Sequence, residues 1–430
     1  MPSWPALGGK EVASRRRARV PCWSQGSELE ILGKPVTRVK VLMISQMVPY
    51  LPCYDGFRVI PAHLLRCLAS RHEFHLMALS EGKESREQLK WPETHCASVR
   101  VLGVRSPRRM ADWFASLGGG LTREIVKAVQ ARLDEVQPDV LHLEGPNLAP
   151  LAILARSGER TVLSAHDSQS LRYREFARFA ASRPLRVIWR MRALVARRFE
   201  QRWFRRADRI VVTSPADSEA LARSVPPERI SVIPNGVDAD YWVYKDPPKS
   251  TRIVFTGNMS WPPNEDAARY FALEVLPVVK ERIPDAEFYI VGAEPSVHVR
   301  ALANLRGVQV TGTVPDIREW VWSASVYVSP LRFGAGVKNK ILEAMALGAP
   351  IVATPKSLTG TPLQHGRHLL TAESTADLAA AIVRLLGDRQ FGQFLSRQAR
   401  RQAEREYSWP ACASRFEELY QKPEAGRYCR

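Results

Sequence analysis

The sequence predicts an α/β protein with two doubly wound parallel sheets, and three observations support this. First, short apolar runs alternate with helical patterns along most of the 430 residues, as in a parallel sheet covered by helices. Second, a polar, proline-containing run at residues 244–250 separates two such series. Third, a chain of this length is sufficient for about two domains, each with its own core. We therefore expect two Rossmann-like units that face each other across a cleft.

The first unit is expected over residues 37–243, after a mobile basic tail at residues 1–36 that is rich in Pro, Gly and Arg and lacks periodicity. Apolar, β-branched runs predict its strands, and spaced apolar residues predict its helices. The strands are expected at residues 38–45, 74–79, 99–104, 139–144, 161–166 and 209–214, and helices at 58–69 and 122–136.

The second unit is expected over residues 251–406, and residues 407–430 follow it. Pro262 and Pro263 suit the first turn of a helix that we expect over residues 263–279. The strands are predicted at residues 252–257, 287–292, 308–314, 326–330 and 350–354, and the last helices at 374–387, 389–407 and 409–421.

Composition narrows the class of protein. The apolar share of 45% and the charged share of 25% are ordinary for a globular protein. No apolar run approaches the roughly 20 residues of a membrane-spanning helix, and no apolar core follows the basic N-terminus, which argues against a secretory signal. The six cysteines form no CxxC pair. We expect neither a zinc site nor a disulfide framework, and a cytoplasmic protein.

The net charge of +18 is concentrated in the first part of the chain. The segment Arg172–Arg206 holds twelve arginines and two glutamates, interleaved with Phe176, Phe179, Trp189, Phe199 and Trp203. Such a segment is typical of a helix on an anionic membrane surface, held by charge rather than insertion, or of a solvated helix whose aromatic residues face the core. No RNA-binding or helix-turn-helix signature supports a nucleic-acid partner.

The most informative stretch, residues 327–354, is predicted as strand, glycine-containing loop, helix and strand. Gly334 and Gly336 allow close approach of backbone N–H groups to a ligand. Lys338 and Lys340 lie where the helix begins, and the amino end of a helix attracts anions. Glu343, three residues after Lys340, projects from the same side of the helix. Backbone amides together with a cation are suited to bind a diphosphate, and a carboxylate is suited to bind sugar hydroxyls. Because a nucleotide-sugar contains both groups, the pattern indicates a nucleotide-sugar site. The alternative is an ordinary crossover with a solvated Lys–Glu pair.

Several motifs of the second unit together resemble glycosyltransferase family 4, a group of retaining, nucleotide-sugar-dependent enzymes with the GT-B fold. They are FTGNMSWPPNEDAARYF (255–271), YIVGAEP (289–295), VQVTGTVPDIREW (308–320), residues 329–360 and HGRHLL (365–370). The first unit matches more loosely, through VLMISQMVPYLPCYDGFR, QPDVLHLEG, SAHDSQS and VIPNGVD. Within the family, the chain looks most like bacterial transferases that build exopolysaccharide or lipopolysaccharide.

The resemblance carries over to the site only in part. It assigns Glu343 to the ribose hydroxyls, but the family's other signature glutamate falls on Ala335. The usual Arg and Lys after the first strand of this unit are also absent from GNMSWPPN. The expected replacement is Lys340, with Lys338, for the charge, and the amides from Gly334 to Val337 as hydrogen-bond donors.

Other positions follow from the same resemblance. His166, at the end of a predicted strand, would lie near the reacting centre, unless it is a structural histidine. Gly56, Asn258 and Val314 are expected to contact the donor, although Asp55–Gly56 is also compatible with a plain turn. Asp167 is expected to cap the arginine-rich helix, and Trp261 to line the cleft or belong to the core. The helix within residues 407–430 would cross back to the first unit.

The implied reaction is retaining transfer of a sugar to a saccharide or a lipid-linked saccharide, in which the protein neutralises the leaving diphosphate. No DxD-type carboxylate cluster is evident, so we expect no metal and no cofactor. Localisation is expected at the inner face of the cell membrane. There are two alternatives. One is a non-hydrolysing nucleotide-sugar epimerase of the same fold, and the other is a membrane or nucleic-acid adaptor that has lost catalysis.

Overall fold

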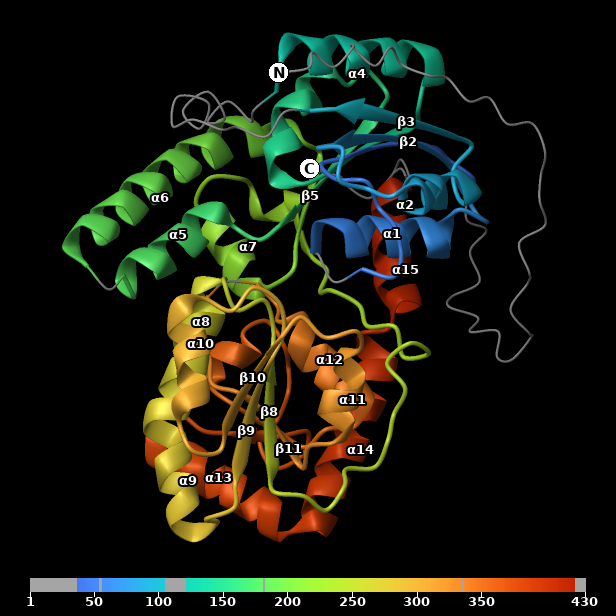
Figure 1. Ribbon diagram of the computed structural model, residues 1–430. Helices are drawn as coiled ribbons and strands as arrows, with labels where there is room; N and C mark the ends of the chain where they lie inside the picture. Colours follow the sequence, from blue (N-terminus) through green and yellow to red (C-terminus); the bar gives the residue numbers. More distant parts are fainter. Residues whose placement is uncertain (1–36, 54–55, 105–120, 181, 335, 422–430) are drawn as a thin grey trace, which may run out of the picture. The chain divides into compact units, whose positions relative to one another are not determined.

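The computed structural model describes residues 37–53, 56–104, 121–180, 182–334 and 336–421. Within these ranges the chain forms two parallel sheets of seven and six strands, as the alternation predicts (Figure 1). The expectations for the tail at 1–36, for Asp55, for Ala335 and for residues 422–430 lie outside the described residues. By packing, the chain divides into two compact units, and the second comprises Ala165–Arg205 and Arg209–Phe416.

The first sheet has the strand order β3-β2-β1-β4-β5-β6-β7. This is the order of a dinucleotide-binding sheet, in which the strands are all parallel and the direction of winding reverses between the first and fourth strands. β1 and β4 are buried along nearly their whole length, which explains their continuous apolar runs. The strands are β1 Lys40–Ser45, β2 Glu73–Ser80, β3 Ser98–Gly103, β4 Val140–Glu144, β5 Arg160–His166, β6 Arg209–Val212 and β7 Ile230–Val232.

The helices around the first sheet begin at serine or threonine caps in several cases, among them Thr122, Ser168, Ser182 and Ser214. The expectation for Asp167 is wrong, because Ser168 accepts the cap hydrogen bond from Leu171 N, whereas Asp167 pairs with Arg172. The α-helices are α1 Gly56–Leu68, α2 Arg86–Lys90, α4 Arg123–Val136, α5 Gln169–Arg178, α6 Arg183–Trp203 and α7 Pro215–Leu221. The arginine-rich segment is therefore two helices, α5 and α6.

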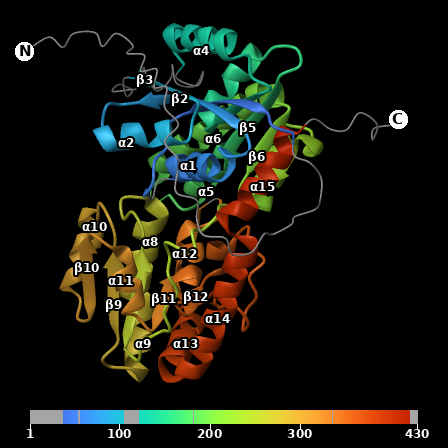
Figure 2. The same ribbon diagram turned by 90° about the vertical axis from the view of Figure 1, so that its right-hand side faces the viewer.

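The second sheet repeats the same order, as β10-β9-β8-β11-β12-β13, and Figure 2 shows its strands side by side. Both of its faces are buried, since Ile253 and Phe255 belong to one apolar cluster and Val254, between them, to another. The strands are β8 Arg252–Thr256, β9 Glu287–Val291, β10 Val308–Gly312, β11 Val326–Ser329, β12 Ile351–Ala353 and β13 Leu370–Thr371.

One predicted helix of the second unit is interrupted. In place of one helix over 263–279, α8 ends at Tyr270, a π-helical turn spans Phe271–Val275, and α9 follows. Pro277, which lacks an N–H, lies at the start of α9, so the longer π turn accommodates it. The helices are α8 Pro262–Tyr270, α9 Leu276–Arg282, α10 Val297–Ala301, α11 Ile317–Trp322, α12 Asn339–Leu347, α13 Thr375–Gly387, α14 Arg389–Glu406 and α15 Trp409–Tyr420.

The last turn of α15 packs against residues of the first sheet and its neighbouring loops. The Tyr420 hydroxyl lies 2.5 Å from Nδ1 of the buried His142. Glu417 contacts Nε2 of His72 at 2.8 Å and pairs with Arg71 at 2.9 Å. Tyr420 is 1% exposed, so these contacts are made in a largely dry environment, where each polar group needs a partner.

We predict that Tyr420→Phe lowers the free energy of unfolding by about 1 kcal/mol, because it removes one buried hydrogen bond and leaves the ring in place. Denaturant unfolding of the full chain, followed by circular dichroism, measures this. An unchanged unfolding midpoint would show that the hydroxyl contributes nothing to the attachment of α15.

Candidate functional site

The strand order places the loops after β8 and β11 next to each other. β8 and β11 are neighbours in the sheet, although β9, β10 and the helices from α8 to α11 lie between them along the chain. The chain reverses its winding at this pair, and ligands of such sheets bind outside the carboxyl ends of the strands there. The loops concerned are residues 257–261 and 330–338, and both belong to the second compact unit.

The loop after β11 has the backbone that its glycines predict. Gly334 has φ 128° and Gly336 has φ 72°, conformations that residues with a side chain rarely adopt. The loop ends at Lys338, the N-cap of α12, which provides no side-chain hydrogen bond to the helix. The first N–H groups of α12 are therefore not capped by that side chain. The amide of Val337 donates to the Thr213 hydroxyl oxygen over 3.5 Å, a long and weak contact.

Lys340 extends from α12 to the end of β8. Its Nζ donates to Asn264 Oδ1 at 2.7 Å and lies 4.4 Å from the centroid of the Phe255 ring. A Cβ atom added to Gly257 would lie 2.7 Å from this Nζ, so the ammonium occupies space that only glycine leaves open. Lys340 thus places a positive charge beside the strand end at which the family resemblance implied cations that this sequence lacks.

The environment of Lys340 opposes its charge. Burial lowers the pKa of Lys340 to about 7, and the positive charge of Lys338 acts in the same direction, whereas Glu343 raises it. The amino end of a helix also disfavours a cation. Burial raises the pKa of Glu343 to about 7, against the influence of Lys340. The pair is therefore close to its titration point at neutral pH, and a bound anion would favour the charged lysine.

Lys338 is in a different situation. Its Nζ donates to the Gly336 carbonyl at 2.6 Å, and burial lowers its pKa to about 8. Three carboxylates act against this shift: Asp217, Asp167 and Glu175. The charge of Lys338 is thus balanced largely within the protein, whereas the carboxylate that opposes the shift of Lys340 is Glu343. Of the two lysines, Lys340 is the better placed to bind an external anion.

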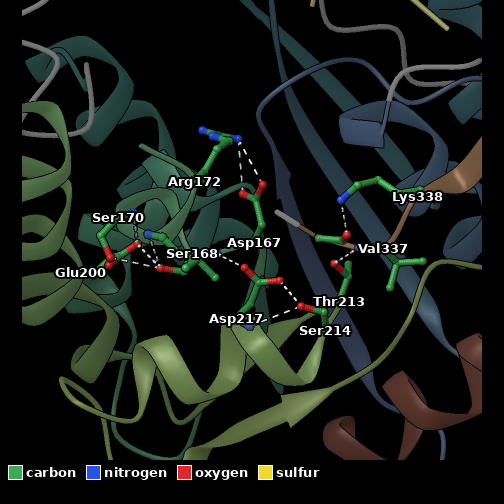
Figure 3. A network of polar contacts seen from close by, with 12 residues as sticks. Asp167, Ser168, Ser170, Arg172, Glu200, Thr213, Ser214, Asp217, Val337 and Lys338 are labelled. Atoms are coloured by element: carbon green, nitrogen blue, oxygen red, sulfur yellow. Dashed lines mark hydrogen bonds and ion pairs between the residues drawn. The ribbon is translucent and has the colours of Figure 1, made fainter. Parts of the chain in front are cut away.

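A buried polar network ties the ends of β5 and β6 to this loop (Figure 3). Asp217 accepts a hydrogen bond from Ser168 N at 2.9 Å and another from the Ser214 hydroxyl. Burial raises the pKa of Asp217 to about 6. The neighbouring Thr213 contacts the loop through Val337, as described above. Glu200 of α6 completes the network by accepting from Ser170 N at 3.0 Å and from the Ser168 hydroxyl at 3.2 Å.

The sequence prediction missed Thr213, Ser214, Asp217 and Asn264. The first three stand at or just after the carboxyl end of a correctly predicted strand, so the strand-end rule that selected His166 also applied to them. Asn264 lies in the first turn of α8, directly after Pro262–Pro263. Its contact with Lys340 joins residues 76 positions apart, which no local pattern indicates.

His166 lies at the end of β5, as predicted, in a left-handed conformation with φ 63°. This conformation is unfavourable for a residue with a side chain, and such strain is often found at functional sites. Its carbonyl accepts from Thr213 N at 2.8 Å. A Cβ added to Gly336 would lie 3.8 Å from Cβ of Asp167, the next residue, so the loop after β5 adjoins the glycine loop. A role in the reaction stays a prediction.

The other predicted donor contacts are spread over the structure. The exposed Asn258 donates to Glu294 Oε2 at 3.1 Å, and its carbonyl accepts from Asn264 at 2.8 Å. Val314 packs against the apolar cluster that contains Val337 and Ile341. Gly56 begins α1 in the other compact unit. Trp261 is 43% exposed and therefore not a core residue. The structure thus brings together the lysines, the glycines, Val337 and Glu343.

The residues that the structure describes contain neither a metal-binding cluster nor a membrane-spanning helix. Among those residues no group of three or more His, Cys, Asp or Glu side chains is arranged to hold a metal ion. No helix within the same ranges is both long and apolar enough to cross a membrane. Independence from metal stays a prediction.

Two family models match the chain in succession. The model described as Glycosyltransferase Family 4 matches residues 54–241, and the model described as Glycosyl transferases group 1 matches residues 250–388. The chain is a family 4 glycosyltransferase. The two matches include most of both sheets, and the second includes Lys340, Glu343 and Asn264.

Curated relatives of this glycosyltransferase include the phosphatidyl-myo-inositol mannosyltransferases of mycobacteria. The protein of Mycobacterium leprae is 26% identical, over 81% of this chain and 91% of its own length. The protein of Mycobacterium tuberculosis H37Rv is also 26% identical, over 81% of this chain and 92% of its own length.

Solved structures confirm the GT-B fold. Sucrose-phosphate synthase from Thermosynechococcus elongatus has a TM-score of 0.64 at 20% identity and covers 89% of this chain and 98% of its own. Anabaena HepE in complex with UDP-glucose has a TM-score of 0.62 at 15% identity, and the match covers 89% of this chain and 99% of the HepE chain. WaaG, a glycosyltransferase involved in lipopolysaccharide biosynthesis, has a TM-score of 0.62 at 14% sequence identity. The match covers 89% of this chain and 100% of the WaaG chain.

We predict that Lys340→Ala lowers the rate of glycosyl transfer by about 10²–10³, because it removes a preorganised charge at the developing anion. Steady-state transfer assays measure this, with thermal unfolding to establish that the variant is folded. Lys249→Ala, which alters an exposed lysine of the same unit, is the control and should retain full activity. Turnover near that of the unmodified enzyme in a folded Lys340→Ala variant would contradict the assignment.

Proposed function

We propose that this glycosyltransferase transfers a sugar from a nucleotide-sugar donor to a saccharide or lipid-linked saccharide, with retention of anomeric configuration, in cell-surface polysaccharide biosynthesis. The observation that carries the proposal is the position of Lys340, a half-buried ammonium beside a glycine loop at the switch point of the second sheet. Glu343 offsets the effect of burial on Lys340 only in part, and the donor diphosphate would supply further negative charge.

The donor diphosphate would be held by Lys340 and by amides of the glycine loop. Backbone N–H groups and a lysine both form strong, charge-assisted hydrogen bonds with phosphate oxygens. The amide of Val337 donates to the Thr213 hydroxyl over a long distance of 3.5 Å, so a phosphate oxygen could replace that hydroxyl at little cost. The same groups would stabilise the charge that develops on the diphosphate as the sugar leaves.

Glu343 would bind the ribose, and its protonation would be coupled to that of Lys340. An ionised carboxylate is a pure acceptor that can take hydrogen bonds from two hydroxyls, whereas a protonated carboxyl group has less acceptor capacity. Diphosphate binding favours the protonated lysine, and a charged Lys340 lowers the pKa of Glu343. The donor would thus bring both groups of the pair into their charged, binding-competent forms. His166 would contact the transferred sugar or its phosphate from the loop after β5.

The acceptor is proposed to be lipid-linked and presented at an anionic membrane surface, on the cytoplasmic face. The relatives described above act, by name, on phosphatidyl-myo-inositol, which is a lipid. The arginines of α5 and α6 offer a positive surface for such a membrane. An epimerase and an adaptor without catalysis are not favoured, since the family models and the curated relatives are transferases.

A donor panel tests the proposal. The enzyme is incubated with UDP-, GDP- and ADP-sugars, including UDP-glucose and GDP-mannose, with and without EDTA, and the released nucleoside diphosphate is measured. We expect release from one donor class, unchanged by EDTA, and a product whose anomeric configuration by NMR equals that of the donor. Interconversion of two nucleotide-sugars would indicate an epimerase, no release from any donor would contradict transfer, and an inverted product would refute retention.

A further inference from the structure

Helix α6 carries an exposed apolar stripe, which we define as Val187, Ile188, Met191 and Leu194. These side chains are 57%, 50%, 56% and 55% exposed, respectively. Their spacing places them on one side of the helix. Isolated exposed apolar residues are common on proteins, but four neighbours on one helix face form a continuous patch, and such patches usually mark a binding surface.

The stripe is not the packing face of the helix. α5 and α6 lie side by side as a helical hairpin (Figure 1). On the packing side, Trp189 stacks on Tyr173 of α5 at 5.7 Å, and Ala193, Ala196 and Glu200 are buried. The helix therefore has two apolar faces, of which one packs against its own unit and the other, the stripe, is exposed.

The exposed charged side chains of α6 are all positive. Glu200 is the one acidic residue of the α6 sequence, and its side chain is buried. Exposed arginines flank the stripe and continue beyond it toward the end of the helix: Arg183, Arg186, Arg190, Arg197, Arg198 and Arg202. An apolar face bordered by arginines is the composition of helices that lie in the interface of a bilayer.

Charge complementarity identifies the occupant. A second copy docked stripe to stripe would oppose arginine to arginine with no exposed carboxylate on either α6, which is unfavourable. A nucleic acid would match the arginines but not four aliphatic side chains. An anionic bilayer matches both, since its headgroups attract the arginines and its acyl region accepts the aliphatic residues.

We propose that α6 docks on an anionic lipid bilayer by inserting the stripe at the boundary between headgroups and acyl chains. The inference rests on the membrane-surface acceptor proposed above, and it changes the mode of attachment from charge alone to charge with insertion. The residues that insert are the aliphatic ones, not the tryptophans of the segment. Trp189 and Trp203, the interleaved aromatic residues of the basic segment, are half-buried, whereas the aliphatic residues between the arginines are exposed.

The docking helix is connected to the glycine loop through α5. Phe179 stacks on Phe333, the residue before Gly334, with ring centroids 4.8 Å apart. Glu175 pairs with Lys356 at 2.5 Å. Because all these residues belong to one compact unit, a lipid bound at the stripe is held by the same body that holds the loop and Lys340.

Vesicle flotation with the full chain tests the proposal. The stripe variant changes Val187, Ile188, Met191 and Leu194 to Ser. The matched control makes the same change at four other exposed aliphatic residues of the unit, Val243, Leu273, Val297 and Leu305. We expect the unmodified protein and the control to bind phosphatidylglycerol-containing vesicles more strongly than neutral ones, with binding that partly survives 0.5 M salt. The stripe variant should bind at least about 100-fold more weakly, because four apolar side chains are lost.

Three outcomes would overturn the inference. Equal binding of the stripe variant and the control would show that the stripe is not inserted, and complete release by salt would show attachment by charge alone. A change of oligomeric state in the stripe variant, without a change in vesicle binding, would assign the stripe to a second copy. Release of nucleoside diphosphate with a soluble acceptor mimic should be equal in all three proteins. If no protein releases it while the vesicle results hold, transfer is refuted and docking stands.

Discussion

The structure of the site depends on one electrostatic constraint: a lysine ammonium is placed, half-buried, at the positive end of a helix. Burial away from water, the helix dipole and the charge of Lys338 all disfavour the charge of Lys340. The protein compensates only in part, with the Asn264 side-chain oxygen, the Phe255 ring and Glu343. Other features follow from this arrangement. Gly257 leaves room for the ammonium, and Gly334 and Gly336 give the adjoining loop a backbone with positive φ. An anion would complete the compensation that the protein leaves unfinished.

The fold supplies this arrangement through strand order. In the second sheet β8 and β11 are adjacent, so loops from distant parts of the sequence meet at their carboxyl ends. The hydrogen bonds of Asp217 and Glu200 extend the site to the ends of β5 and β6 and to the α5–α6 hairpin. The proposed donor site and the proposed lipid-docking stripe thus belong to one compact unit. This combination suits an enzyme whose soluble donor must meet an acceptor embedded in a bilayer.

Much of this was predictable from the sequence, because buried parallel strands are short apolar runs and the glycine–lysine loop is a local pattern. Lys340, Glu343, Gly334 and Gly336 stand out in this way, and their roles in the site stay predictions. What the sequence did not predict depends on contacts between distant residues or on a choice between similar neighbours. The Lys340–Asn264 contact is of the first kind. The helix cap is of the second kind, since Asp167 and Ser168 are both good caps and only the backbone conformation selects the serine. In α6, periodicity indicates apolar residues on two sides but not which side is packed.

Proton uptake on binding of a nucleoside diphosphate tests the central claim most directly. If Lys340 has a pKa of about 7 in the free enzyme, it is largely neutral at pH 8 and must gain a proton when the diphosphate binds. Calorimetry at pH 8 in buffers of different ionisation enthalpy should show uptake approaching one proton for each UDP or GDP bound. Lys340→Arg should bind without uptake, since a guanidinium is charged at every pH used. Binding to the unmodified enzyme with no proton linkage, or equal uptake by Lys340→Arg, would contradict the account.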